Sequence, residues 1–249
     1  FQKPSDIVIA DFDNEEARTM VQDAPGAILF SSVKHGIEGD GAWLADETLL
    51  VSGEGKESVL LPLSDVPLKG EHNISNVLLA ALASLAAGLS VKEVRSGIKS
   101  FPGVPHRLEK VALKNSVTYY NDTAATIPDA AVAALRSFSE PVILIAGGSD
   151  KRLDFTSLAK EILTRSKGLV LFKGEGTEKL LQALQDLLPA EEKGRSFEVV
   201  ESMAKAVELA SRSAEAGDVI LLSPGAASFG VFKNEFDRGE QFRNAVGIL

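Results

Sequence analysis

The stretch VILIAGGSDK at residues 142–151 places five apolar residues before two glycines and a charged turn. A short apolar run that ends in glycine is typical of a strand buried on both faces of a sheet. Further strand candidates occur at 117–121, 169–172, 197–200 and 219–222. Segments of helical length separate them, and this alternation indicates strand–helix–strand crossovers. We therefore predict an α/β fold with a Rossmann-like, doubly wound and mostly parallel sheet.

Four helices are expected between these strands, and the chain before them has a different pattern. The helices span about 128–137, 155–165, 177–188 and 203–214. Residues 1–70 show short apolar runs among loops punctuated by glycine, which predicts short strands and turns. The runs are Ile7 to Ala10, Ala27 to Phe30 and Leu49 to Val51, and two helices are expected after them at 75–87 and 91–99.

The segment FPGVP at residues 101–105 is the expected domain junction. Two prolines around a glycine cannot continue the preceding helix, and such a segment can act as a hinge. We expect one domain at residues 1–102 and a second at 103–249. The chain begins with Phe1 rather than Met and opens directly on a strand, which indicates that it starts inside a larger protein.

Composition limits the classes of protein to which the chain can belong. Hydrophobic residues make up 45% and charged residues 24%, which is ordinary for a soluble globular domain. The formal net charge of -9 argues against binding to nucleic acid or to an anionic membrane, since both need a basic surface. The longest apolar stretch, residues 77–89, is too short to span a bilayer. We expect no nucleic-acid partner and no membrane partner.

Common catalytic and metal-binding motifs are missing from the sequence. There is no cysteine, which excludes disulfides and thiolate metal sites, and His35, His72 and His106 lack metal-ligand spacing. The tripeptide GEG at 174–176 begins like a dinucleotide fingerprint, but Lys179 stands where a third glycine should be. The chain has neither a P-loop motif nor a Gly-x-Ser-x-Gly nucleophile elbow. We predict no catalytic and no metal-ligating residue within it.

Unusual residues gather where the predicted parallel strands end. In an open parallel sheet, ligands bind outside the carboxyl ends of the strands. Small residues, hydroxyls and charges follow four strands, at 121–126, 147–151, 173–177 and 223–228. Each turn can expose the N–H groups of a helix N-terminus to an anion. The spacing predicts a shared anion-binding crevice, and by itself it identifies no substrate.

Four segments, in chain order, extend this interpretation. They are GEHNISN at 70–76, FPGVPHRLE at 101–109, NDTAAT at 121–126, and the region 223–242 with SPGAASF and FDRG. They resemble the Mur ligase family, and specifically its D-glutamate-adding branch. The resemblance implies three domains: one for the UDP-sugar, a central ATPase and a C-terminal amino-acid-binding domain.

By this resemblance, residues 1–102 are the tail of the central α/β ATPase domain and 103–249 are the complete C-terminal domain. The UDP-binding domain, the P-loop, the magnesium-binding glutamate and the carbamylated lysine would all precede Phe1. The resemblance implies a monomeric, cytoplasmic enzyme of peptidoglycan precursor synthesis, with roles in cell shape and division. The chain alone is expected to be inactive.

The implied reaction joins D-glutamate to UDP-N-acetylmuramoyl-L-alanine with ATP and Mg²⁺, through an acyl phosphate. Ligands for the metal are expected mainly outside this chain. Two alternatives stay open. One is another Mur or folylpolyglutamate-type amino-acid ligase, and the other is a non-catalytic module that binds a nucleotide or an anion.

The resemblance assigns four residues to ATP. Asn73 and Asn76 match asparagines of the family that lie at the adenine of ATP. A side-chain amide offers both the donor and the acceptor that an adenine edge requires. Arg107 and Asp122 match the pair that closes over ATP from the C-terminal domain. The alternatives are that the asparagines cap a helix and that Arg107 pairs with Glu109 or with another surface acid.

Five residues match the D-glutamate site: Thr126, Lys151, Ser228, Phe229 and Phe236. A dicarboxylate needs a cation together with hydroxyl and N–H donors, which these strand-end turns supply. The alternatives are that Lys151 is a solvated loop lysine and that Phe236 is a core aromatic.

One departure from the branch concerns the turn at 121–127. Ala124 stands where the D-glutamate-adding branch commonly has lysine, and this removes a cation. The following Thr126-Ile127-Pro128-Asp129 is similar to sister ligases that add lysine or diaminopimelate. Their Asp-Asn-Pro-Arg segment is absent here, so D-glutamate remains the expected acceptor.

Overall fold

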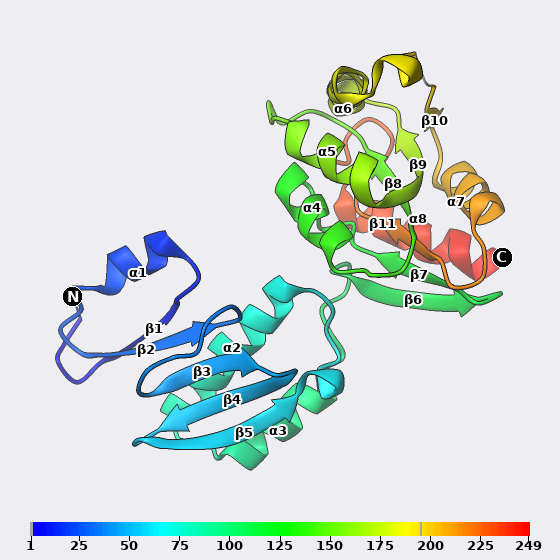
Figure 1. Ribbon diagram of the computed structural model, residues 1–249. Helices are drawn as coiled ribbons and strands as arrows, with labels where there is room; N and C mark the ends of the chain where they lie inside the picture. The colour runs from blue at the N-terminus through cyan, green and yellow to red at the C-terminus, as the bar shows by residue number, and fades with distance from the viewer. Residues whose placement is uncertain (1, 195) are drawn as a thin grey trace. The chain divides into compact units, whose positions relative to one another are not determined.

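The computed structural model describes residues 2–194 and 196–249. The chain divides into two compact units, residues 1–103 and 104–249, and each is described by itself (Figure 1). The division falls within the expected junction at 101–105, one residue after the expected end of the first domain at 102. No helix among the described residues is both long and apolar enough to cross a membrane.

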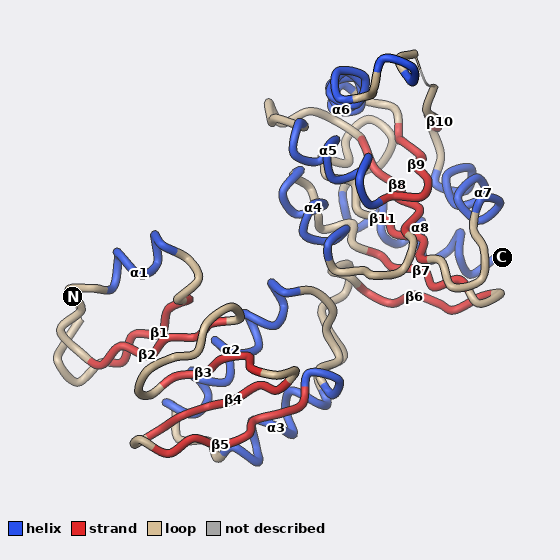
Figure 2. The backbone as a smooth tube through the Cα atoms, in the orientation of Figure 1, coloured by secondary structure: helices blue, strands red, loops and turns tan. Residues whose placement is uncertain are grey.

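The N-terminal unit contains one mixed sheet with helices on one face. Its strands lie in the order β1-β2-β3-β4-β5, with parallel pairing from β1 to β3 and antiparallel pairing from β3 to β5. Helices α2 and α3 pack behind this sheet in the view of Figures 1 and 2. The elements are β1 (Ile7–Asp11), α1 (Glu15–Val21), β2 (Ala27–Ser32), β3 (Gly41–Ala45), β4 (Thr48–Gly53), β5 (Lys56–Pro62), α2 (Glu71–Ala86) and α3 (Val91–Ser100).

The core of this unit lies between the sheet and α2. Leu78 and Leu82 of α2 are buried against Leu49 of β4 and Leu60 of β5. The helix begins four residues earlier than expected, because Gly70 serves as its N-cap at φ 97, where a side chain would be strained. The sequence analysis also missed α1, β3 and β5.

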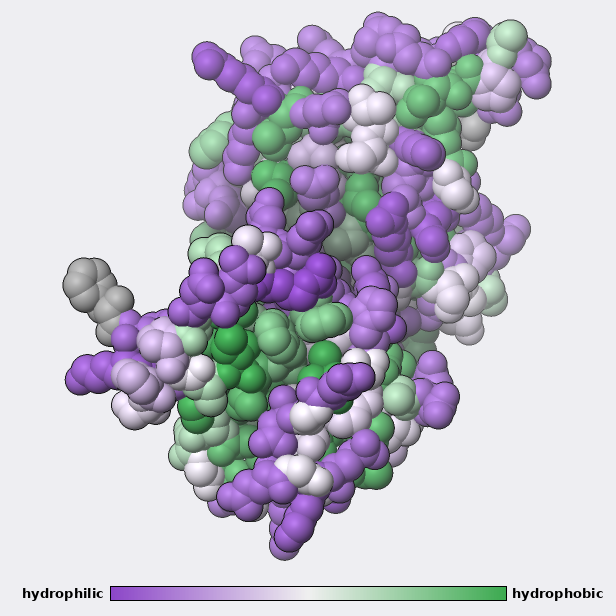
Figure 3. All heavy atoms as spheres, turned by 60° about the vertical axis from the view of Figure 1, so that its left-hand side comes forward, coloured by the Kyte–Doolittle hydropathy of each residue, from purple (hydrophilic) through white to green (hydrophobic). Residues whose placement is uncertain are grey.

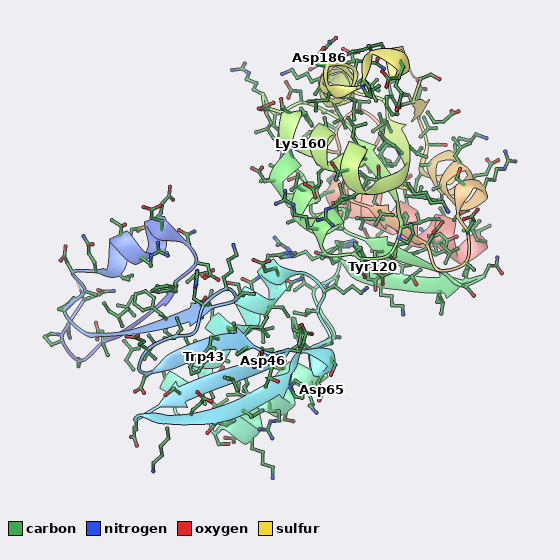
Figure 4. All side chains as sticks on the ribbon, in the orientation of Figure 1. Trp43, Asp46, Asp65, Tyr120, Lys160 and Asp186 are labelled. Atoms are coloured by element: carbon green, nitrogen blue, oxygen red, sulfur yellow. The ribbon has the colours of Figure 1, made fainter. Side chains whose placement is uncertain are left out.

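The other face of the sheet carries apolar residues as well. Trp43 of β3, labelled in Figure 4, pairs with Leu50 of β4, and Leu50 pairs with Val59 of β5. Val59 is 52% exposed. Figure 3 shows apolar side chains gathered on part of the surface of this unit.

The C-terminal unit contains a sheet in the order β10-β9-β8-β11-β7-β6. All neighbours are parallel except β6, which pairs antiparallel with β7 at one edge. The elements are β6 (Glu109–Lys114), β7 (Val117–Asn121), α4 (Pro128–Arg136), β8 (Val142–Gly147), α5 (Thr156–Arg165), β9 (Ser166–Phe172), α6 (Glu175–Leu187), β10 (Glu198–Val200), α7 (Met203–Ser213), β11 (Val219–Leu222) and α8 (Glu235–Ile248).

Helices cover both faces of this sheet, as Figures 1 and 2 show, and a hydrophobic core lies on each face. Helices α4, α5 and α6 pack on one face, where Tyr120 of β7 stacks edge-on against Phe138 with ring centroids 4.9 Å apart. Helices α7 and α8 pack on the other face around Phe172 and Phe242. Every residue of β8 is buried. The predicted doubly wound, mostly parallel α/β fold is confirmed, although β6 and α8 were not predicted.

The strand order creates a point where neighbouring strands send their chains to opposite faces. Strands β8 and β11 are adjacent, yet β8 continues into α5 on one face and β11 into α8 on the other. Such a switch point leaves a crevice at the carboxyl ends of the strands. The loops after β7, β8 and β11 surround it.

Candidate functional site

Backbone hydrogen bonds fasten the three loops at this switch point to one another. Ser149 in the loop after β8 and Ala227 in the loop after β11 exchange two hydrogen bonds, of 2.9 and 3.2 Å. The amide of Gly225 donates to the carbonyl of Ala125, in the loop after β7, at 2.9 Å. The amide of Gly147 donates to the Pro224 carbonyl at 2.8 Å. Three of the four predicted turns therefore form one continuous edge.

The N-terminus of α4 and a lysine meet at this edge. The ammonium of Lys151 lies 3.2 Å from the Thr126 hydroxyl. Helix α4 begins just after, with Pro128 in its first turn and, among the described residues, no side chain capping it. Its free N–H groups and partial positive charge add to the charge of Lys151. The arrangement is suited to a carboxylate or a phosphate.

The turn before α6 is built differently. The carbonyl of Gly148 accepts hydrogen bonds from the amides of Gly176 and Thr177, at 3.0 and 3.3 Å. A Cβ on Gly174 would lie 2.3 Å from the same oxygen, so only glycine permits this approach. The expectation that this turn offers its N–H groups to an anion was wrong, because protein backbone already occupies them.

Asp122 is buried and fully engaged with the protein. Its Oδ2 accepts a hydrogen bond of 2.7 Å from Ser223, and its Oδ1 accepts one of 3.1 Å from the amide of Leu108. Burial raises the pKa of this carboxyl to about 6, against the opposing effects of the two hydrogen bonds and of the Arg107 charge. Asp122 thus holds the segment that carries Arg107.

Arg107 is exposed and forms no ion pair among the residues that the structure describes. Its suggested partner Glu109 is taken by Arg243 of α8, whose Nη2 lies 2.7 and 2.8 Å from the two carboxylate oxygens. The alternative pairing of Arg107 with Glu109 is therefore wrong. The guanidinium of Arg107 remains available to a ligand.

In the N-terminal unit, a hollow of about 430 Å³ lies where the parallel strands β1 and β2 end and α2 begins. Asp13, Lys34, His72 and Asn76 are among the residues that line it. Asn76 also borders an apolar groove of about 370 Å³ along α2 and α3. It is therefore placed between a polar and an apolar hollow.

Known proteins resemble this chain in sequence and in fold. The model of the Mur ligase, glutamate ligase domain, matches residues 106–225. A UDP-N-acetylmuramoylalanine--D-glutamate ligase from Roseiflexus sp. (strain RS-1) is 42% identical over 98% of this chain and 53% of its own length. The chain belongs to the Mur ligase family.

Solved structures of the Mur ligase family and of a related synthase share this fold. MurF from Acinetobacter baumannii matches with a TM-score of 0.66 at 16% identity, covering 99% of this chain and 53% of its own. Folylpolyglutamate synthase from Mycobacterium tuberculosis, complexed with ADP and AMPPCP, matches with a TM-score of 0.61 at 17% identity, covering 99% and 56%. The chain spans about half the length of the curated relatives that it matches.

The residues assigned through the Mur ligase resemblance are divided between the two units, with Asn73 and Asn76 in the N-terminal unit and the others in the C-terminal unit. Thr126, Lys151 and Ser228 come from the three fastened loops of the C-terminal unit. Ser228 is 4% exposed, whereas Phe229 and Phe236 are 61% and 60% exposed. The alternative that Phe236 is a core aromatic is therefore wrong.

The asparagines of the N-terminal unit differ from each other. The side-chain amide of Asn73 donates to the Lys69 carbonyl at 2.7 Å, and Asn76 is exposed on α2. Since Gly70 is the N-cap of that helix, neither asparagine caps it.

Several residues that the sequence analysis did not single out complete the site. Asn121 donates to Nδ1 of His106 at 3.0 Å, and the His106 ring packs edge-on against Phe236 at 5.7 Å. Thr123 and Arg238 link the loop after β7 to α8. Their signal was their place inside the motifs at 101–109, 121–126 and 223–242.

The described residues contain no group of three or more His, Asp or Glu side chains that could hold a metal ion.

Proposed function

We propose that this chain forms the acceptor-binding unit, and part of the ATP-binding unit, of a ligase that adds D-glutamate to UDP-N-acetylmuramoyl-L-alanine. The observation that carries the proposal is the contact of 3.2 Å between Lys151 and Thr126 beside the uncapped N-terminus of α4. A cation, hydroxyls and free N–H groups are what a dicarboxylate acceptor requires. The 42% identity to a relative named for this activity supports the same acceptor.

The proposed acceptor residues contribute positive charge, hydrogen-bond donors and apolar surface. Lys151 and the start of α4 bind one carboxylate of D-glutamate, with Thr126 fixing the lysine. The Ser228 hydroxyl, nearly buried, donates to the acceptor from the loop after β11. Phe229 and Phe236 expose apolar surface that the bound acceptor covers. The amine is then held still for attack on an activated carboxylate.

On the nucleotide side, Asn76 contacts the adenine and Arg107 contacts the ribose or a phosphate of ATP. Asp122 accepts a hydrogen bond from the backbone amide of Leu108, and this bond keeps the neighbouring Arg107 in place. ATP phosphorylates the carboxylate of the UDP-sugar-linked alanine, the D-glutamate amine attacks the acyl phosphate, and phosphate leaves. Residues 1–102 and 103–249 correspond in this proposal to the tail of the ATPase domain and to the amino-acid-binding domain.

The protein is proposed to act in the cytoplasm as a monomer, in peptidoglycan synthesis and hence in cell shape and division. ATP use is supported by the ADP-bound state of a related synthase. Mg²⁺ would balance the charge of the phosphates.

A second candidate is a sister ligase with another amino acid. Ala124 and the Thr126-Ile127-Pro128-Asp129 sequence favour it, since they depart from the D-glutamate-adding branch. Release of phosphate by the complete ligase should be assayed with D-glutamate, L-lysine, meso-diaminopimelate and D-alanyl-D-alanine. The proposal expects turnover with D-glutamate only, and preference for another acceptor would replace it with the second candidate.

A further inference from the structure

Arg238 has the largest fully buried side chain among the described residues. It lies in the first turn of α8 and is 0% exposed. Arginine is almost never fully buried unless an anion pairs with it. In the part of the chain that the structure describes, Arg238 forms no ion pair, and its three hydrogen bonds all go to neutral oxygen atoms.

These hydrogen bonds tie two loops to α8. Arg238 Nε donates to the Thr123 hydroxyl at 2.9 Å and Nη2 to the Thr123 carbonyl at 3.0 Å. Nη1 donates to the Ala226 carbonyl at 3.2 Å. The Thr123 hydroxyl donates in turn to the Glu235 carbonyl at 3.0 Å. One side chain therefore joins the loop after β7, the loop after β11 and the start of α8.

Both loops lead directly to proposed acceptor residues. Thr126 follows Thr123 by three positions, and Ser228 follows Ala226 by two. A neutral amide has one nitrogen and two N–H groups, so it could make at most two of the three donations that Arg238 makes from three nitrogen atoms. Burial lowers the pKa of Arg238 to about 10, so the guanidinium still keeps its charge at neutral pH.

We propose that Arg238 is a positioning residue whose unpaired charge lies behind the acceptor site and favours the binding of an anionic amino acid there. This inference rests on the proposed function and deepens it. The arginine fixes the loops that carry Thr126 and Ser228. The charge of Glu235 acts on its guanidinium, and a bound dicarboxylate adds a second negative charge to that balance. With Ala124 in place of a lysine, the site depends more strongly on this buried cation.

Steady-state kinetics of the complete ligase test the role of the charge. Arg238→Gln keeps a donor and removes the charge, whereas Arg238→Lys keeps the charge and loses the planar fork. Arg238→Gln is expected to raise the KM for D-glutamate by roughly tenfold or more, with the KM for ATP changed less than about twofold. Arg238→Lys should raise the KM for D-glutamate less than Arg238→Gln does. Equal effects of the two variants, or parallel changes in both KM values, would overturn the role of the charge.

The positioning role has a test that needs no turnover. Thr123→Val keeps Arg238 and its charge but removes the hydroxyl that links it to Glu235. Amide hydrogen exchange in residues 122–126 and 224–228 of this chain should then speed up about tenfold, while exchange in β8 stays unchanged. Unchanged exchange in both loops would contradict the positioning role, even if no Arg238 variant folds. If exchange becomes faster but the parent ligase shows no turnover with D-glutamate, the proposed function is contradicted and the positioning role of Arg238 is retained.

Discussion

The Ser223 hydroxyl donates a hydrogen bond of 2.7 Å to the Asp122 carboxylate, joining the loop after β11 to the loop after β7. The acid is buried, and burial raises its pKa from 3.8 to about 6. Because the folded-state pKa is raised, the contribution of Asp122 to stability is fully present below about pH 4 and is lost as the pH rises through about 6.

Asp122→Asn should therefore flatten the dependence of stability on pH. Two pKa units correspond to roughly 3 kcal/mol, so urea unfolding of the parent should lose part of this amount between about pH 4 and pH 7. The variant should lack this component. Ser223→Ala serves as a control, because removing a hydrogen bond to the ionised form should move the transition to higher pH. An identical pH profile for Asp122→Asn and the parent would show that the carboxyl is not perturbed.

A second prediction concerns the close approach of the turn before α6. In Gly174→Ala, the new Cβ would lie 2.3 Å from the Gly148 carbonyl oxygen, and backbone must move. We expect a loss of about 2 kcal/mol or more in the free energy of unfolding. Gly247→Ala in α8 is the matched control, since nothing lies within 4 Å of its added Cβ. The control should be neutral or stabilising by up to about 1 kcal/mol. Equal stability of the two variants would contradict the packing of this turn.

The central parallel strands β8 and β11 could be predicted because each is a compact apolar run buried on both faces. Strands β5 and β6 were missed because they lie at sheet edges and carry charged residues. Helix α8 was missed because its buried face contains Arg238 and Gly239, which give no apolar period.

The candidate site shows a similar limit. Thr126 and Lys151 could be assigned because they follow predicted strands, and their contact depends only on strand ends meeting at one edge. That the Gly148 carbonyl would take the N–H groups of α6 could not be predicted, since this contact depends on backbone approach between distant loops. The hydrogen bonds from Leu108 and Ser223 to the two carboxylate oxygens of Asp122 could not be predicted for the same reason, since they also join different loops.

A third prediction concerns activity of this chain by itself. Without a P-loop in its sequence, it lacks the usual means of holding the phosphates of ATP. Phosphate release with ATP, magnesium, D-glutamate and UDP-N-acetylmuramoyl-L-alanine should stay at background. Addition of the remainder of the ligase as a separate polypeptide provides the positive control. Specific turnover by the chain alone would contradict the proposal that this chain supplies only part of the ATP-binding unit.

The central claim is that Lys151 binds the carboxylate of the acceptor. Lys160, an exposed lysine on α5 labelled in Figure 4, is a matched control from the same unit. The most direct measurement is the KM for D-glutamate of the complete ligase with Lys151→Ala, beside Lys160→Ala and the parent. Loss of a charge-assisted hydrogen bond predicts an increase of about ten- to a hundredfold for Lys151→Ala, with the KM for ATP nearly unchanged and Lys160→Ala equal to the parent. A folded Lys151→Ala enzyme with the KM of the parent for D-glutamate would contradict the account and make Lys151 a solvated loop residue.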